Sequence, residues 1–356
     1  MPTTSLDLLF VAAGTLYRYG VSVGEERIAE EWLVEVIGSR ERTIFERVTN
    51  EAGEVEVQFG EVLNASEKLK ALKTVGGPPG QSFLATIRTN LDIEAQGQDL
   101  SSVIEWFAKT LVLVGAGEPI GPVAHLLFGS EEMMQFASEF LWAASTGVTR
   151  IEATREEISI GDLLRILPPH SWPHVQDPKL AGRLTVVDLG NGRELTIDRK
   201  EEGQFHSVSL QSVHEGGSLE VSDESDGTRR LLDLLPALYN LNAHGGVYVI
   251  DEIDRSLHPH LILKFVEFFI SRCAGQNRQL IMTTHESNLL DLDLLRRDEI
   301  WFAEKDERGA THLYSMSDFK VRTDHEVRKH YLQGRFGAIP FLGDLDRLIR
   351  ESQPQP

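Results

Sequence analysis

The 356-residue sequence has one cysteine, no long apolar run and a deficit of basic residues. The single cysteine, Cys273, excludes an internal disulfide, and we expect it to be a buried structural residue in a reducing compartment. No apolar run approaches the ~20 residues of a membrane span. The N-terminal segment 1–14 lacks the basic region of a secretory signal. We therefore expect a cytoplasmic protein with no membrane-spanning segment.

Acidic residues outnumber basic residues by 55 to 35, which gives a formal net charge of −20. Broad, nonspecific binding to nucleic acid depends on Lys and Arg neutralising phosphates, so this charge argues against it for the chain alone. A local basic patch stays open in two segments, Arg150–Lys200 and His325–Arg335. A solvated surface is the simpler interpretation of both.

The hydrophobic pattern divides the chain into five parts. Residues 1–60 contain short alternating runs without helices between them, which predicts an antiparallel β unit. Residues 61–180 have mostly helical periodicity, including Leu100–Gly115, and predict a helical insertion or arm. Strand patterns return in 181–216 and are interpreted as a continuation of the first β unit. Residues 217–320 alternate helix and strand, which predicts an α/β lobe with a parallel core sheet and a hairpin across Asp306–Ala310, and 321–356 form a C-terminal tail.

Two carboxylates follow an apolar run in the α/β lobe. Gly246–Ile250 is rich in β-branched residues and predicts a strand buried on both faces of a parallel sheet. Asp251 and Glu252 would then lie at its carboxyl end, where such sheets bind ligands. Because neighbouring strand residues point opposite ways, one carboxylate could face a hydrated cation and the other an attacking water. The alternative is a strand that ends in a polar turn.

Polar residues precede a predicted helix at Ser225–Thr228. The free N–H groups and the dipole of a helix N-terminus favour anions, so this turn is a candidate anion site. The alternative is a plain N-cap by Ser225.

A second predicted buried strand, Gln279–Thr284, ends at His285. A histidine at that sheet edge can donate to a terminal phosphate or orient water. His258 and His260 lie near the acidic turn and raise the alternative of a metal-dependent hydrolase or nuclease. Their spacing matches no defined metal-ligand pattern, and Pro259 between them suits the first position of a helix.

Together these segments resemble the ABC-type ATPases, and more closely the RecF, SMC and OLD-like branch of bacterial AAA-type ATP-binding proteins found in defence and restriction loci. The resemblance covers nearly the whole chain. In this family's terms the motifs are the signature motif Glu224–Thr228, the Walker B strand Val247–Glu252, the D-loop Asp254–Pro259 and the switch segment Thr283–Ser287. The implied fold is the C-terminal lobe of a P-loop NTPase with an added antiparallel β unit and a helical insertion.

The resemblance also implies site residues and cofactors. Two heads would enclose ATP and Mg²⁺. Asp251 would hold Mg²⁺ through water, Glu252 would act as the catalytic base, and His285 would contact the γ-phosphate. Ser225 and Gly227 would contact the nucleotide of the opposite head, while Ser256 and His258 would couple the two heads.

The sequence departs from this family in one respect: GxxxxGK[ST] occurs nowhere. That loop and its lysine hold the β- and γ-phosphates, so this chain alone cannot build a complete ATP site. Three explanations stay open: a shortened gene, a split protein with its Walker A segment on another chain, or a regulator that has lost activity.

Three functions are therefore considered. The first is an incomplete ATPase head that works as a homodimer or with a Walker A-bearing partner, in antiphage defence with a nuclease effector. The second is a non-hydrolytic interaction module that retains the dimer face. The third is the metal-dependent hydrolase.

Overall fold

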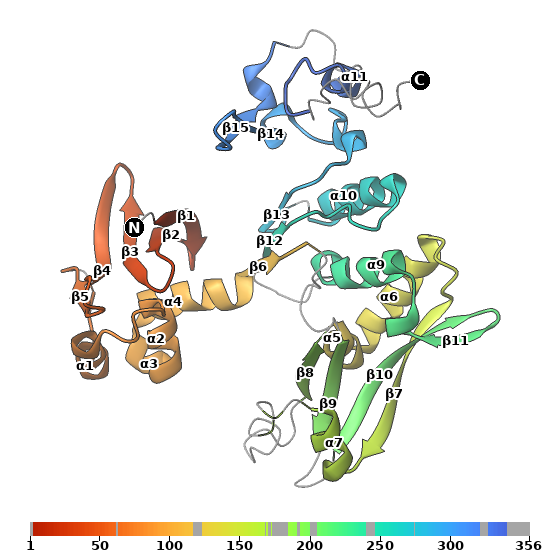
Figure 1. The fold of residues 1–356 in the computed structure, drawn as a ribbon, viewed down its shortest axis with the longest axis horizontal. Helices are drawn as coiled ribbons and strands as arrows, with labels where there is room; N and C mark the ends of the chain where they lie inside the picture. Colours follow the sequence, from red (N-terminus) through yellow and green to blue (C-terminus); the bar gives the residue numbers. More distant parts are fainter. Residues whose placement is uncertain are drawn as a thin grey trace, which may run out of the picture. The chain divides into compact units, whose positions relative to one another are not determined.

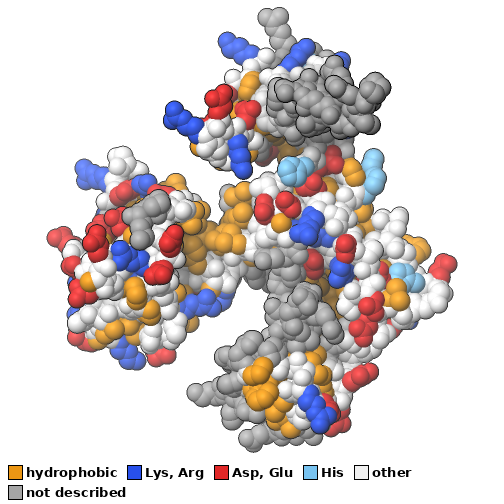
Figure 2. All heavy atoms as spheres, in the orientation of Figure 1, with side chains coloured by type: hydrophobic (Ala, Val, Ile, Leu, Met, Phe, Trp, Pro, Cys, Tyr) orange, Lys and Arg blue, Asp and Glu red, His pale blue; other side chains and the backbone are white. Residues whose placement is uncertain are grey.

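The chain forms a mixed α/β fold in two compact units, residues 1–112 with 244–247 and residues 113–243 with 248–356 (Figure 1). The structure is a computed structural model. It describes residues 3–61, 63–116, 123–167, 169, 172, 184–190, 193–199, 205–239, 246–273, 275–320 and 327–339. No described helix has the length and apolarity needed to cross a membrane. Acidic side chains are scattered over the visible surface, in keeping with the net charge of −20 (Figure 2).

The first unit begins with a five-stranded antiparallel meander, as the alternating runs predicted. Its inward positions, such as Leu33 and Phe45, are fully buried, because alternate strand residues share one face. The strands pair in sequence order: β1 (Thr4–Ala12), β2 (Thr15–Val23), β3 (Ile28–Ile37), β4 (Arg40–Thr49) and β5 (Val55–Phe59).

Helices of the same unit pack on this meander in one hydrophobic core. Ser66 and Ser82 cap the first two helices by accepting from the backbone amide three residues ahead. The helices are α1 (Glu67–Val75), α2 (Phe83–Asn90), α3 (Ile93–Gln96), α4 (Gln98–Glu105) and the π-helical turn η1 (Trp106–Thr110).

A buried carboxylate, Glu31 on β3, joins the meander to α2. Its side chain accepts from the amides of Phe83 and Leu84, at 2.6 and 3.3 Å, and from the hydroxyl of Tyr19 at 3.1 Å. Burial raises the pKa of Glu31, although these hydrogen bonds oppose the shift. Glu31 thus satisfies helix N–H groups that would otherwise be buried without a partner.

The second unit contains a separate antiparallel sheet. Its strands are β7 (Arg150–Ile158), β8 (Leu184–Gly190), β9 (Arg193–Arg199), β10 (Phe205–His214) and β11 (Gly217–Glu220). The order is β11-β10-β9-β8, with β7 also paired to β10. The prediction that the returning strands continue the N-terminal β unit was therefore wrong, because β10 pairs with β7 and not with the meander.

Helices cover part of this second sheet. The helices α5 (Val123–Phe128), α6 (Glu131–Ala143) and α9 (Asp226–Leu238) share a core with β7 and β10. The short helix α7 (Ile160–Ile166) packs against β9 and β10 in a smaller core. The helices predicted between residues 61 and 180 thus divide between the two units.

A three-stranded sheet carries the acidic turn. Its order is β13-β12-β6, with β6 (Leu111–Val114), β12 (Gly246–Ile250) and β13 (Arg278–Met282). The amide of Thr283 donates to Ile250, while the carbonyl of Thr283 accepts from Ile253. A residue that bonds to two different residues across the ladder is typical of parallel pairing.

Two predictions about this sheet need correction. The apolar run Leu100–Gly115 was predicted as one helix, but its last part is β6, because pairing with β12 decides its conformation. Gln279–Thr284 was predicted as a buried strand, but Ile281 is 56% exposed. Helix α10 (Pro259–Cys273) begins at Pro259 as predicted, and Cys273 at its end is half-buried.

The C-terminal part of the second unit holds the predicted hairpin. It pairs β14 (Trp301–Lys305) with β15 (Thr311–Ser315), and a small aromatic core around Phe302 and Phe336 supports it. The remaining described elements are the 3-10 turns η4 (Val221–Asp223), η5 (Ser287–Leu289), η6 (Arg297–Glu299) and η7 (Met316–Asp318), and helix α11 (Val327–Leu332).

We predict that Glu31→Ala destabilises the protein by on the order of 3 kcal/mol, because two buried amides lose their acceptor. Urea unfolding of the full chain measures the change. The control is Glu56→Ala on β5, an exposed carboxylate, for which we expect less than about 0.5 kcal/mol. Equal losses for the two variants would contradict the capping role of Glu31.

Candidate functional site

The hydroxyl of Thr283 joins the ends of two neighbouring strands. It donates to Asp251 Oδ1, at 2.5 Å, and accepts from the backbone amide of Glu252, at 2.8 Å. Asp251 follows β12 and Thr283 follows β13, so both lie at the carboxyl edge of the parallel sheet. The predicted carboxylate pair is therefore held at the edge where such sheets bind ligands.

The residues after β12 form a turn, Asp251–Ser256. Glu252 and Ser256 in this turn have φ of 46° and 62°, a left-handed conformation that non-glycine residues seldom adopt. Such conformations persist where the surrounding structure holds them, and they concentrate at functional sites. Because β12 ends at Ile250, the strand alternation proposed for Asp251 and Glu252 does not apply: Glu252 is oriented by the turn.

The switch segment is tied to the same turn. The amide of His285 donates to Asp254 Oδ1 at 3.3 Å, and the amide of Ile253 donates to the carbonyl of Thr283 at 3.1 Å. His285 is exposed. The structure thus brings His285 to the same edge as Asp251 and Glu252, as the order of strands predicted.

The N-terminus of α9 lies against the far end of the turn. Ser225 is its N-cap and accepts from the amide of Thr228 at 3.2 Å. A Cβ at Gly227 would lie 3.0 Å from the carbonyl oxygen of Ser256. Glycine therefore permits a close approach between the signature turn and the D-loop turn.

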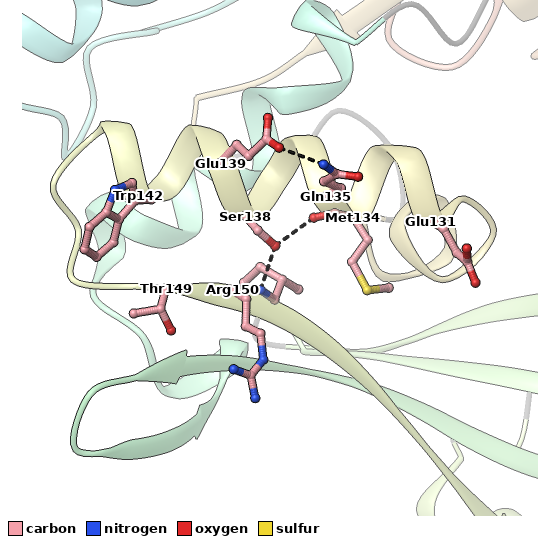
Figure 3. Close-up of a pocket in the computed structure, with 9 residues that line it drawn as sticks. Glu131, Met134, Gln135, Ser138, Glu139, Trp142, Thr149 and Arg150 are labelled. Carbon is pink, nitrogen blue, oxygen red and sulfur yellow. Dashed lines mark hydrogen bonds between the residues drawn. The ribbon is translucent and has the colours of Figure 1, made fainter.

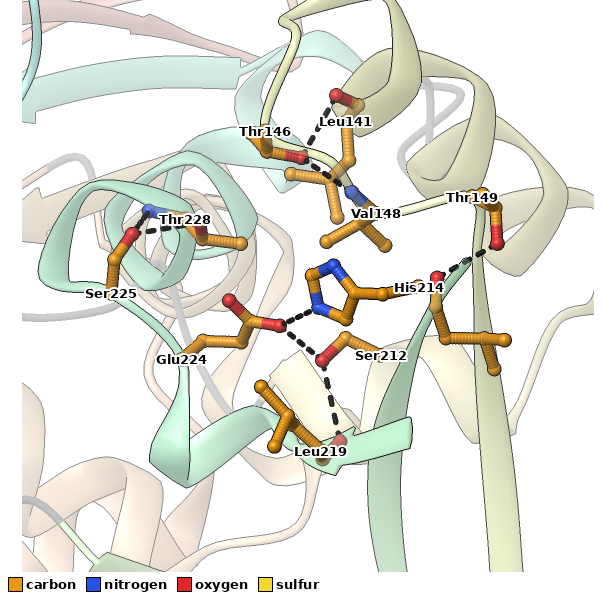
Figure 4. A network of polar contacts seen from close by, with 11 residues as sticks. Leu141, Thr146, Val148, Thr149, Ser212, His214, Leu219, Glu224, Ser225 and Thr228 are labelled. Atoms are coloured by element: carbon orange, nitrogen blue, oxygen red, sulfur yellow. Dashed lines mark hydrogen bonds and ion pairs between the residues drawn. The ribbon is translucent and has the colours of Figure 1, made fainter. Parts of the chain in front are cut away.

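A polar network fixes the residue before this N-cap (Figure 4). Glu224 accepts from Ser212 Oγ, and its Oε1 lies 2.6 Å from His214 Nε2. The Glu224 side chain is only 6% exposed. Burial opposes its ionisation, but the hydrogen bonds from Ser212 and His214 outweigh burial and hold the pKa of Glu224 below its ordinary value.

His258 and His260 do not form a metal site with the acidic turn. Their rings stack with centroids 5.4 Å apart, and His258 Nδ1 accepts from the His260 amide at 3.3 Å. Among the described residues, no three His, Cys, Asp or Glu side chains gather closely enough to hold a metal by themselves. The geometry gives the metal-dependent hydrolase no support.

Sequence reasoning identified the segments of the site but missed the contacts that join them. The bridging role of Thr283 and the amide contact of Asp254 depend on pairing between strands some thirty residues apart. Glu224 was visible in the signature motif, but no sequence signal connects it to Ser212 and His214 on β10. The sequence showed only that an acidic residue lies directly before the N-cap serine, which does not identify the partners of that residue.

A groove elsewhere in the second unit does not include these residues. It has a volume of about 630 Å³ and lies between α6 and β7, with Met134, Trp142 and Ile151 among its apolar lining residues (Figure 3). The candidate site is instead an exposed sheet edge, formed by the turn after β12 and the segment after β13.

Comparison with known proteins gives a family match and a similar solved structure. Residues 137–291, less than half of the chain, match the family described as "AAA domain, putative AbiEii toxin, Type IV TA system". The SMC head domain from Thermotoga maritima is 14% identical, with a TM-score of 0.32, and the match covers 87% of this chain and 76% of that one. No curated protein matches the chain.

We predict that Gly227→Ala loosens the turn at Ser256, because the added methyl meets a backbone oxygen at 3.0 Å. Amide hydrogen exchange of peptides covering residues 252–258 should become faster. The control is Gly161→Ala, also at the second position of a helix, where the nearest atom to a Cβ is 3.8 Å away. Unchanged exchange in Gly227→Ala would show that the contact does not support the turn.

We also predict that Glu224 contributes stability that depends on pH. Because its folded pKa is lowered, this stability is present above its unfolded pKa of about 4.3 and is lost as the pH falls through the folded pKa. Glu224→Gln should therefore reduce the difference in unfolding free energy between pH 6 and pH 3, measured by urea titration. An identical pH dependence in both proteins would rule out this role.

Proposed function

We propose that this chain supplies the water-activating and signature parts of an ABC-type ATPase head. The observation that carries the proposal is the Thr283 hydroxyl between Asp251 and the Glu252 amide. Metal-assisted phosphoryl transfer needs a carboxylate near the cation and a second group for the attacking water. The family match of residues 137–291 supports an AAA-type nucleotide-binding domain.

The residues present fit Mg²⁺. This ion prefers oxygen ligands, keeps several waters and uses one or two carboxylates together with substrate phosphates. Asp251 is exposed and has a hydroxyl neighbour in Thr283. We infer that Asp251 would hold the hydrated ion, which would neutralise charge on the transferred phosphate when bound.

The other residues receive roles from their positions. Glu252 would accept a proton from the attacking water. Its left-handed backbone conformation in the turn sets its orientation. His285 would donate to the terminal phosphate oxygen. The Asp254 contact to its amide holds that segment beside the turn.

The signature residues would act on a second nucleotide. Ser225 and Gly227 stand at the N-terminus of α9, where backbone N–H groups and the helix dipole attract phosphate. Ser256 approaches Gly227, so a movement of the D-loop turn would reach the signature turn directly. From the resemblance to ABC-type ATPases, we propose that Ser256 and His258 couple the heads of a dimer.

Partners and biological role are inferred from resemblance. The matched family's description names a putative AbiEii toxin and a Type IV TA system. We propose a related role in antiphage defence, with a nuclease effector. ATP and Mg²⁺ are the proposed cofactors, and the lysine loop would come from a GxxxxGK[ST]-bearing segment.

We predict little ATP hydrolysis by this chain alone and Mg²⁺-dependent hydrolysis when a GxxxxGK[ST]-bearing segment is bound. Glu252→Gln should then lower kcat by about 10²- to 10⁴-fold, because the general base is lost, while ATP binding persists. A phosphate-release assay and nucleotide titration measure the two effects.

The matched control is Glu267→Gln on α10, an exposed carboxylate paired with Lys264, which should leave kcat unchanged. Robust hydrolysis by the isolated chain would contradict the proposal. Tight assembly with the lysine-loop segment but no hydrolysis would favour the non-hydrolytic interaction module.

A further inference from the structure

A groove along one side of α6 is separate from the candidate site. It lies between α6 and β7, and each residue that lines it belongs to the second unit. The α6 residues of the lining follow one another in steps of three or four, which places them on one face of the helix. From Glu131 to Trp142 this row extends about 17 Å, at the rise of an α-helix. The lining residues on α6 are Glu131, Met134, Gln135, Ser138, Glu139 and Trp142.

The floor of the groove is apolar and ends in an aromatic side chain. Met134 and Ile151 line it, and Trp142, at the opposite end of the row from Glu131, is 60% exposed (Figure 3). The other face of α6 is already buried in the core that it shares with β7 and β10. Aromatic residues and methionine are enriched in protein interfaces. This second apolar face of α6 therefore has the composition of a surface that binds a partner.

The polar groups in the floor are already hydrogen-bonded. Ser138 Oγ accepts from the backbone amide of Ile151 at 2.9 Å and donates to the carbonyl of Met134 at 2.8 Å (Figure 3). Ile151 thus has no free amide for a strand added to β7 at this point. An occupant has to bind through its side chains, as an amphipathic helix does in a groove.

The charge of the rim indicates the chemistry of the occupant. Glu131 and Glu139 line the rim, whereas Arg150, the cation in the described lining, pairs with Glu152 at 2.6 Å. The net charge of −20 adds repulsion toward nucleic acid and toward a second copy of this chain. Charge complementarity therefore favours a partner that carries Lys and Arg beside its apolar residues.

We propose that this groove is the docking site for a basic amphipathic helix of a partner protein. Apolar side chains one helical turn apart would pack on Met134, Ile151 and Trp142. Lys or Arg side chains that flank them would meet Glu131 and Glu139. A helix of about three turns matches the length of the row on α6. The site is independent of ATP hydrolysis, because no residue in its lining belongs to the acidic turn or the signature turn.

Site-specific photo-crosslinking tests whether such a partner occupies the groove. The photoreactive residue p-benzoylphenylalanine replaces Trp142 in the full chain, inside the cells that make it, and cross-linked peptides are identified by mass spectrometry. The control position is Trp301 on β14, which is also 60% exposed. We expect cross-links several-fold above the control. They should map to a segment of another protein with a net positive charge and with apolar residues three or four positions apart.

Each outcome of this experiment decides the proposal. Cross-links to a segment with both properties support it. Cross-links to an acidic segment, to a segment without helical periodicity or to another copy of this chain would overturn it. Cross-links only within the chain, or no more abundant than at Trp301, would also overturn it.

A binding measurement with a synthetic peptide of the cross-linked segment tests the apolar contact. Trp142→Ala should raise the Kd of the peptide for the full chain by at least about tenfold, because buried tryptophans carry much of the binding energy of an interface. Trp301→Ala is the matched control and should leave the Kd unchanged. Both side chains are exposed, so neither variant should shift the urea unfolding midpoint. A Kd that Trp142→Ala does not change would contradict docking in this groove.

Charge reversal tests the acidic rim. Replacing Glu131 and Glu139 together with Lys should raise the Kd by roughly tenfold, because the rim would then repel the basic helix. The control replaces Glu25 and Glu26, two exposed residues between β2 and β3, and changes the net charge by the same amount. Equal losses in the two double variants would show that only the overall charge attracts the peptide, and the groove would lose its proposed role.

Discussion

The parallel pairing of β12 with β13, closed by the Thr283 hydroxyl, is the constraint on which the candidate site depends. Asp251 and His285 are 34 residues apart in the chain, and the register of the two strands brings them to the same edge of the sheet. The hydroxyl also accepts from the Glu252 amide, so one side chain restrains the carboxylate and the start of the strained turn.

A second constraint acts from β10. Glu224 is almost fully buried, and its contacts to Ser212 and His214 attach the signature turn to the sheet of β7 to β11. The cost of burying the carboxylate is offset by those hydrogen bonds, which is why its pKa falls. The position of Ser225 therefore depends on a sheet that contributes no residue to the Asp251 edge.

The sequence predicted correctly those elements whose structure depends on residues close together in the chain. The short runs of residues 1–60 indicated a meander, in which strands that are neighbours in the sequence pair. In the same way, Ser225 caps a helix and Pro259 begins another, as predicted. The incorrect predictions concern segments whose structure depends on pairing with distant parts of the chain. Leu111–Val114 becomes a strand through β12, more than 130 residues later, and the returning strands pair with β7. Pairing between distant segments overrides periodicity, and it also creates the contacts of Thr283 and Glu224.

The charge of the acidic turn sets a condition for any phosphate bound there. Asp251, Glu252 and Asp254 place three carboxylates within four residues, and Arg255 in the same turn already donates to the carbonyl of Ala116. Because like charges repel, a phosphate at this sheet edge would need positive charge from outside the turn, from a bound cation or from basic side chains.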